Sequence, residues 1–213
     1  MNRILQFCAA LLVPPAASAH PHVFVEASVT LVFDEEGDLS VRLNWQYDEL
    51  FSLLVTSDFG LDMDGDLVLT AAEQTVLERE IAAWPDDFAG DLEVMQGEAL
   101  LTLGAKQGHE MVYEDGLFIE RHLRPVADVP DLSEPLRIRV YDPAFYTAYD
   151  LMRPVTVEGR DDCAVEVISA DLDAAYALAA ELTGNIDFSS DGPDDYFPAI
   201  GDAFADTIVL TCA

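Results

Sequence analysis

Basic residues are scarce in this 213-residue chain, which holds 10 Lys+Arg against 41 Asp+Glu and carries a formal net charge of −31. A nucleic-acid-binding protein replaces condensed counterions with its own cationic side chains, so this balance excludes that class. Anionic membrane surfaces are excluded as partners for the same reason. Hydrophobic residues make up 51% of the chain, enough to bury a core, so the acidity predicts a charged shell around a folded protein.

The short motifs of common enzyme classes are missing as well. The sequence contains no G-x-S-x-G, no H-E-x-x-H, no phosphate-binding loop and no C-x-x-C. Its many carboxylates are spread too evenly to single out an acid–base pair. We therefore expect a protein that is not an enzyme.

No apolar run is long enough to cross a bilayer, which takes roughly 20 residues. The apolar run Ile4–Val13 follows a short positive start and precedes the small residues Ala17-Ser18-Ala19. This pattern predicts a signal peptide over residues 1–19, cleaved before His20, and no direct membrane insertion of the exported protein. The remaining residues, 20–213, are expected to form one domain. The alternative is a buried helix at the start of the chain.

Cysteine is rare, with three in the chain, and Cys8 lies inside the predicted signal peptide. The pair that remains, Cys163 and Cys212, predicts a disulfide, because paired thiols of exported proteins become oxidised outside the cytosol. Closing a loop of about 50 residues stabilises a fold by roughly 4 kcal/mol in the chain-entropy model. A metal site that uses the two thiols is the alternative. It is weaker because the thiols lie far apart in the sequence and neither has a histidine nearby.

Alternation of apolar and polar residues predicts strands over most of the chain, beginning with a hairpin of 22–33 and 39–47. Helical spacing predicts two helices, within 48–58 and 70–84, which form a helix–loop–helix insertion. The other predicted elements are strands at 92–95, 99–104, 109–114, 117–124, 136–142, 145–150 and 207–211, helices at 171–182 and 197–204, and a loop at 185–195. We expect an α+β fold that is mostly antiparallel β and sandwich-like, with a helical C-terminal excursion tied back by the disulfide.

The most specific local motif is an acidic loop between the two inserted helices, residues 62–73, DMDGDLVLTAAE. Placed on a twelve-residue calcium loop, its candidate ligands are Asp62, Asp64, Asp66, the carbonyl of Val68, Thr70 and Glu73. Position 6 requires a sharp turn that glycine makes easily, and Leu67 stands there instead, at a cost on the order of 1 kcal/mol. The alternative is structural, because Thr70-x-x-Glu73 is also a helix capping box. Both can hold together, so calcium is a possible cofactor.

The first two of the four histidines, His20 and His22, lie at the start of the predicted mature chain. Residues two apart in a strand face the same side, which groups both imidazoles with Glu26. Neutral imidazole is a good ligand for zinc, copper and nickel. Pro21 has no N–H to deprotonate, so the square-planar N-terminal copper and nickel motif is excluded. A divalent transition metal held by side chains, zinc first among them, is the expected cofactor.

The other two histidines, His109 and His122, flank a predicted hairpin turn at Asp115-Gly116. A two-residue turn there would place His109 directly opposite His122, with their Cβ atoms about 5 Å apart. A longer loop would break this register. The alternative for any one of these histidines is a solvated or capped side chain, and whether all four histidines form one site or two is left open.

Several segments together resemble a known family: His20–Val25, Trp45–Glu49 with Phe51-Ser52, Asp62–Glu73, Val140–Tyr146, Cys163 and Phe204–Cys212. Taken in this order, the chain resembles the DUF1007 family, described as periplasmic components of an uncharacterised ABC-type transport system. Its members tend to be encoded near nickel, cobalt or zinc transporters. The resemblance therefore implies a periplasmic location, a membrane metal transporter as partner, and roles for His20, His22 and the loop aspartates.

Three hypotheses follow. In the leading one, the protein is a soluble periplasmic metal-binding accessory of a transition-metal transport system. It would bind the ion through His20 and His22 with Glu26, or through His109 and His122. The second is a calcium-stabilised β-sandwich interaction module with no transported ligand. The third is a metalloenzyme that uses the N-terminal histidines.

Overall fold

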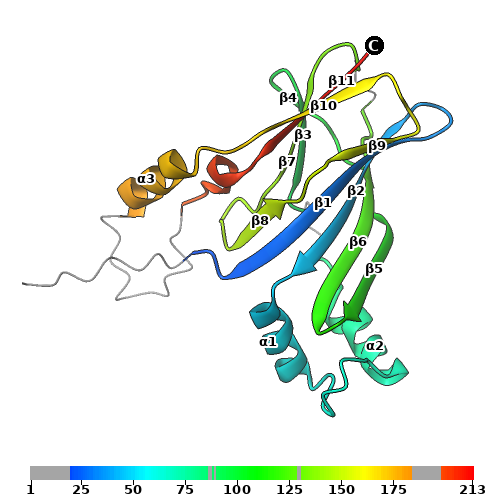
Figure 1. Cartoon of the computed structure of the whole chain (residues 1–213), viewed down its shortest axis with the longest axis vertical. Helices are drawn as coiled ribbons and strands as arrows, with labels where there is room; N and C mark the ends of the chain where they lie inside the picture. Colours follow the sequence, from blue (N-terminus) through cyan, green and yellow to red (C-terminus); the bar gives the residue numbers. More distant parts are fainter. Residues whose placement is uncertain (1–19, 86–87, 89, 129–130, 184–197) are drawn as a thin grey trace, which may run out of the picture.

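The computed structural model describes residues 20–85, 88, 90–128, 131–183 and 198–213. The predicted signal peptide, residues 1–19, and the predicted loop at 185–195 lie outside these ranges. Within them the chain forms two β-sheets with a few helices, mostly antiparallel, as predicted (Figure 1). None of the helices among the described residues combines the length and the hydrophobicity needed to cross a bilayer.

The first sheet is built on the long hairpin of β1 (Val23–Phe33) and β2 (Leu39–Tyr47), which pair over nine positions from Val25↔Tyr47 to Phe33↔Leu39. Inward residues of β1 alternate with outward ones, as the period of a half-buried strand requires. The sheet order is β5-β6-β2-β1-β8, with β9 also pairing with β1. The other strands are β5 (Gln107–Glu114), β6 (Leu117–Pro125), β8 (Thr147–Leu151) and β9 (Thr156–Glu158). The pairings of β8 and β9 with β1 are parallel, which the local pattern did not indicate.

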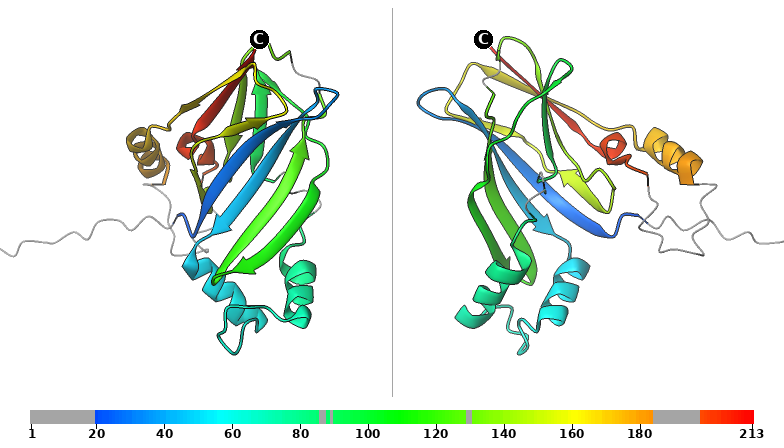
Figure 2. Two further views of the ribbon diagram at one scale, coloured as in Figure 1. Left: turned by 45° about the vertical axis from the view of Figure 1, so that its right-hand side comes forward. Right: turned by 180° about the vertical axis from the view of Figure 1, so that it is seen from behind.

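The second sheet has the order β10-β11-β7-β3-β4. Its strands are β3 (Leu92–Gln96), β4 (Ala99–Leu100), β7 (Leu136–Val140), β10 (Cys163–Ile168) and β11 (Thr207–Cys212). The hydrophobic core lies between the two sheets and includes Leu31, Val41, Trp45, Ile138 and Leu210. The sheets lie close together near the C-terminus and diverge toward the other end of the molecule (Figure 2). That divergence opens one side of the sandwich.

The helical insertion follows β2 as predicted, with α1 at Glu49–Phe59 and α2 at Ala71–Val76. The side chain of Asp48 caps α1 by accepting a hydrogen bond from the backbone N–H of Phe51. The second helix differs from prediction. It changes at Leu77 into a π-helical turn, Leu77–Ile81, and ends before Trp84. A second small core, which includes Leu77, Met111 and Phe118, fixes the insertion against β5 and β6.

The C-terminal excursion leaves β10, forms α3 (Leu172–Thr183) and the short 3₁₀ helix η3 (Gly201–Phe204), and returns as β11. Asp171, the first residue of the helix predicted at 171–182, accepts a hydrogen bond from the N–H of Ala174 at the start of α3. The predicted disulfide is confirmed: Cys163 and Cys212 are register partners on β10 and β11, and their sulfurs are bonded. Strand β10 was not predicted, and α3 projects from the side of the sandwich (Figure 1).

Candidate functional site

The two N-terminal histidines lie beside each other at the start of β1. Their ring centroids are 5.0 Å apart, and the ring of Tyr146 lies 4.8 Å from that of His22. The N–H of His22 donates a hydrogen bond to the carbonyl of Tyr146, which fixes this end of β1. His20 is buried, whereas His22 is exposed. The pair therefore combines one shielded imidazole with one that solvent reaches.

Glu26 lies on β1, which begins directly after these histidines, but is not brought to them. Four residues of extended chain span about 13 Å. Glu26 instead has Asp150 of β8 and Gln46 of β2 as register partners, and its Oε2 accepts a hydrogen bond from Gln46 Nε2 at 3.4 Å. Among the described residues, only Asp62, Asp64 and Asp66 bring three candidate ligand atoms within 4.8 Å of one another. The His20–His22 pair thus offers two protein ligands without Glu26.

The hairpin of β5 and β6 brings His109 and His122 together, although not in the predicted register. Glu114 pairs with Leu117 and Glu110 with Arg121, as a two-residue turn requires, but a bulge between Gln107 and Glu110 shifts the register. Gly108 lies in this bulge with φ +55, a conformation that glycine adopts at little cost. The prediction that His109 lies directly opposite His122 is therefore wrong. Their ring centroids are nevertheless only 6.3 Å apart.

His109 belongs to a hydrogen-bonded network centred on Glu120, which is buried. Glu120 interacts with His109 Nε2 at 2.7 Å and accepts hydrogen bonds from Trp84 Nε1 at 2.7 Å and Tyr47 Oη at 2.8 Å. Burial raises the pKa of Glu120, but the hydrogen bonds from His109 and Tyr47 outweigh it, so the pKa falls below its usual value. The other nitrogen of His109, Nδ1, lies 3.3 Å from Lys106 Nζ. Both nitrogens of His109 therefore already have neighbours.

His122 is a buried imidazole in an aromatic setting. It is 2% exposed, and neither ring nitrogen has a hydrogen-bond partner in the described part of the chain. Its ring meets Trp45 and Trp84 edge to face, at centroid distances of 4.7 Å and 4.8 Å. Burial lowers the pKa of His122 to about 4, so the ring is neutral at physiological pH. Because Nε2 of His109 interacts with Glu120, this nitrogen would have to leave Glu120 before it could bind a metal. Metal binding by this second histidine pair stays a prediction.

The acidic loop folds partly as a calcium loop and partly as a cap. Carboxylate oxygens of Asp62, Asp64 and Asp66 gather within 4.8 Å of one another. Leu67 has the left-handed φ of +62 that the sixth position of such a loop demands. The carboxylate of Glu73 accepts hydrogen bonds from the N–H groups of Asp62 and Thr70, both at 2.8 Å, so the capping box is present. Thr70 therefore caps α2, and the exposed Val68 donates its N–H to Asp66. Of the predicted calcium ligands, the three aspartates are the ones whose carboxylate oxygens the loop brings together.

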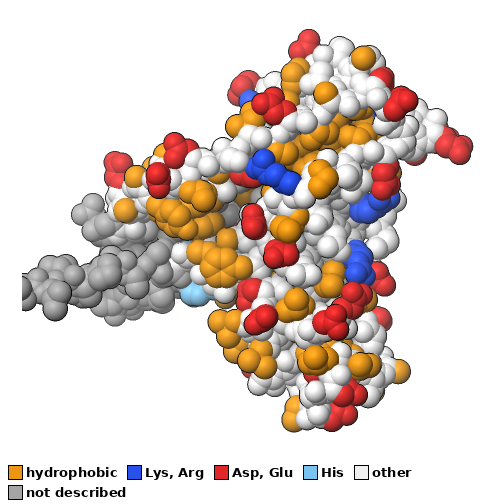
Figure 3. Space-filling view, in the orientation of Figure 1, with side chains coloured by type: hydrophobic (Ala, Val, Ile, Leu, Met, Phe, Trp, Pro, Cys, Tyr) orange, Lys and Arg blue, Asp and Glu red, His pale blue; other side chains and the backbone are white. Residues whose placement is uncertain are grey.

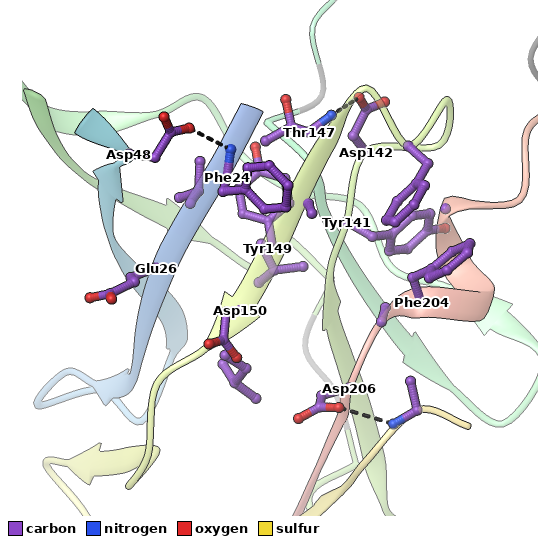
Figure 4. Close-up of a pocket in the computed structure, with 18 of the residues that line it drawn as sticks. Phe24, Glu26, Asp48, Tyr141, Asp142, Thr147, Tyr149, Asp150, Phe204 and Asp206 are labelled. Atoms are coloured by element: carbon purple, nitrogen blue, oxygen red, sulfur yellow. Dashed lines mark hydrogen bonds between the residues drawn. The ribbon is translucent and has the colours of Figure 1, made fainter. Parts of the chain in front are cut away.

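A groove of about 860 Å³ opens on the side where the sheets diverge, and the sequence analysis did not identify it. Residues of β1, β8, η3 and α3 line it. In Figure 4, Phe24 and Tyr149 stand on the side formed by β1 and β8, with Tyr141 and Phe204 across from them. Six acidic residues and one basic residue line the groove: Glu26, Asp48, Glu49, Asp142, Asp150, Asp206 and Arg153.

Three of these carboxylates fix the local backbone through hydrogen bonds from main-chain N–H groups. Asp48 accepts hydrogen bonds from the N–H groups of Phe24 and Phe51, and Asp142 accepts them from Ala144 and Thr147. Asp206 accepts from the N–H of Ala170 and pairs with Arg153 at 2.8 Å. The signal for this groove in the sequence is the run Tyr141–Tyr146, where a turn-forming Asp-Pro is surrounded by aromatic residues. Aromatic residues of that kind are more often core residues, so the run alone does not reveal a groove.

Comparison with protein families matches residues 5–212 to the model of a family described as "Protein of unknown function (DUF1007)". Comparison with curated proteins finds no match. The family match covers nearly the whole chain and includes the histidine pair, the acidic loop, the groove and the disulfide. It provides no activity against which the geometry can be interpreted.

Proposed function

The chain belongs to the DUF1007 family, and from this premise we propose that it is a periplasmic metal-binding accessory protein of a transition-metal transport system. The observation that carries the proposal is the 5.0 Å separation of the His20 and His22 rings at the start of β1. Two neutral imidazoles at this separation can both direct a nitrogen to one zinc, nickel or copper ion after small side-chain rotations. Water or the amino group of a chain cleaved before His20 would complete the coordination.

The charge of the molecule supports the same function. A net charge of −31 attracts divalent cations and raises their concentration near the surface. This long-range attraction does not distinguish calcium from zinc, whereas the nitrogen ligands of the histidine pair do. The carboxylates would gather cations, and the two imidazoles would select the softer ones.

The test is a calorimetric titration of the exported protein, with its N-terminus established by mass spectrometry. After removal of bound metals, zinc, nickel and copper are added to the wild type and to a His20→Ala/His22→Ala variant. We expect one equivalent to bind with a micromolar or tighter Kd, and the double variant to lose at least about 100-fold in affinity, or roughly 2.7 kcal/mol.

A matched variant, His109→Ala, removes an imidazole from the other pair and should leave the tight binding unchanged. If His109→Ala loses metal binding and His20→Ala/His22→Ala does not, the metal would be assigned to the β5–β6 hairpin instead. Absence of any binding tighter than millimolar in the wild type would contradict the proposed function.

The second candidate, a calcium-stabilised interaction module, is favoured by one observation, the clustering of three aspartate carboxylates in the loop at 62–73. The same titration performed with calcium distinguishes it. Calcium binding that Asp62→Asn/Asp64→Asn removes, together with no transition-metal binding, would support the module.

A further inference from the structure

The groove between the diverging sheets ends at an unpaired strand edge. Strand β8 is the last strand of its sheet and, within the described ranges, pairs with β1 alone. An open edge presents backbone N–H and C=O groups that another extended chain can complete. Strand β8 has five residues, which is about 16 Å of edge. The N–H of Thr147 at its start already donates to Asp142, so a peptide can pair with the rest of this edge.

Two carboxylates occupy neighbouring positions in the β1–β8 pairing beside this edge. Glu26 of β1 and Asp150 of β8 are register partners, and both are exposed. Like charges directly opposite each other in neighbouring strands destabilise a sheet. No Lys or Arg among the described residues forms an ion pair with either of them. Figure 4 shows both side chains on the strands that form one side of the groove. A cation brought by a ligand would relieve this repulsion.

The lining of the groove as a whole is negatively charged. Six acidic residues line it against Arg153 alone, and Arg153 is already paired with Asp206. The acidic lining disfavours a second copy of this chain, whose net charge is −31. It also disfavours residues 184–197 of the chain itself, which contain four aspartates and no Lys or Arg. An occupant complementary to this groove must be cationic.

The walls of the groove are apolar and partly uncovered. Phe24 on β1 and both Leu172 and Tyr176 on α3 are more than half exposed, at 55%, 52% and 51%. In Figure 3 hydrophobic side chains gather over α3 and over the neighbouring end of the sandwich, with acidic side chains among them. A strand has two faces, so an added peptide can direct basic residues to one face and apolar residues to the other.

From the open edge, the Glu26–Asp150 pair and the apolar walls, we propose that the groove binds an extended, basic and apolar peptide segment of a partner protein, which adds as a strand to β8. The peptide backbone pairs with β8, and its Lys or Arg side chains neutralise Glu26 and Asp150 while their aliphatic stems cover Phe24, which lies on the same face of β1 as Glu26. Its apolar side chains, on the other face, pack against Leu172 and Tyr176. Metal binding at His20 and His22 is not required.

Fluorescence anisotropy with labelled seven-residue peptides tests the proposal on the full exported protein. The probe is acetyl-Val-Lys-Val-Lys-Val-Lys-Val-amide, and its counterpart carries Glu in place of Lys. We expect the lysine peptide to bind and to weaken as NaCl rises, and the glutamate peptide not to bind. Alternate N-methylation of the lysine peptide should abolish binding, because it removes the donors that pair with a strand edge.

Glu26→Gln/Asp150→Asn should weaken binding of the lysine peptide by about tenfold, since it removes both proposed ion pairs. The matched control, Glu35→Gln/Glu36→Gln, removes the same charge from the exposed β1–β2 turn and should stay within twofold of wild type. His20→Ala/His22→Ala should also bind the peptide like wild type, which separates this inference from the metal proposal.

Four results would overturn the inference. Equal binding of the two peptides would show that charge does not select the occupant of the groove. An equal loss of affinity in the control variant would show only the general field of the protein. Binding that survives N-methylation would exclude strand addition. Self-association of the wild type that Glu26→Gln/Asp150→Asn changes would assign the groove to a second copy.

Discussion

At the scale of single residues, His122 shows how burial sets the behaviour of a titratable group. Its folded pKa of about 4 lies below the ordinary value of 6.5. As the pH falls through this window, the unfolded chain takes up a proton that the folded chain does not, so stability is lost from about pH 6.5 down to about pH 4. The contribution is on the order of 3 kcal/mol and is fully present above pH 6.5. Urea unfolding of wild type and His122→Leu across this range should show a flatter pH dependence for the variant.

Asp91 is the natural control because its effect has the opposite sign. Burial raises its pKa to about 7, against a hydrogen bond from Tyr149 that lowers it. The folded state therefore holds a proton between about pH 4 and 7 that the unfolded chain has released, and this contribution is lost as the pH rises through 7. The free energy of unfolding of Asp91→Asn, relative to that of wild type, should therefore increase as the pH rises from about 4 to about 7. If both variants follow the wild-type curve, the burial of these two groups does not control the acid side of the stability profile.

At the scale of elements, the sequence was most informative where structure is local. The hairpins β1–β2 and β5–β6 and the capping box of α2 depend on residues close together in the chain, and each was predictable. The register of His109 was not, because Gly108 introduces a bulge that the Asp-Gly turn does not signal. The parallel pairing of β8 with β1 joins residues more than 100 positions apart, and no local pattern encodes such a contact.

The backbone of the acidic loop is strained at one residue. Leu67 occupies a left-handed conformation with φ +62, where its Cβ is strained. Leu67→Gly should therefore stabilise the protein by up to about 1 kcal/mol, reduced by the greater entropy of glycine in the unfolded chain. Val68→Gly is the matched control, since Val68 has no positive φ and should lose stability by the same entropic cost. The measurement is urea unfolding. A loss of stability in Leu67→Gly would show that packing of this side chain near Gly116 outweighs the strain.

At the scale of the whole molecule, the groove was invisible in the sequence for a physical reason. Its walls come from β1, from the segment around β8, and from α3 and η3, which meet only after both sheets have formed. The histidine pair at 20 and 22 could be anticipated because residues two positions apart in the chain lie near each other whatever the fold. The Glu26–Asp150 pair could not, because it depends on which strand lies beside β1.

The excess of negative charge on the molecule determines how salt should affect its thermal stability. Ten basic residues can neutralise at most ten of the 41 acidic ones, so folding compresses an excess of negative charge into a smaller volume. Raising NaCl from 0.01 M to 1 M shortens the Debye length from about 30 Å to about 3 Å and screens this repulsion. Salt also weakens surface ion pairs such as Arg42–Glu158, but each contributes only about 0–1 kcal/mol, and the unpaired carboxylates outnumber them. The midpoint of thermal unfolding should therefore rise with NaCl, and it should rise less steeply in Glu26→Gln/Asp150→Asn, which already lacks two of the repelling charges. A midpoint that falls with salt would mean that ion pairs, not repulsion, dominate the electrostatics of this fold.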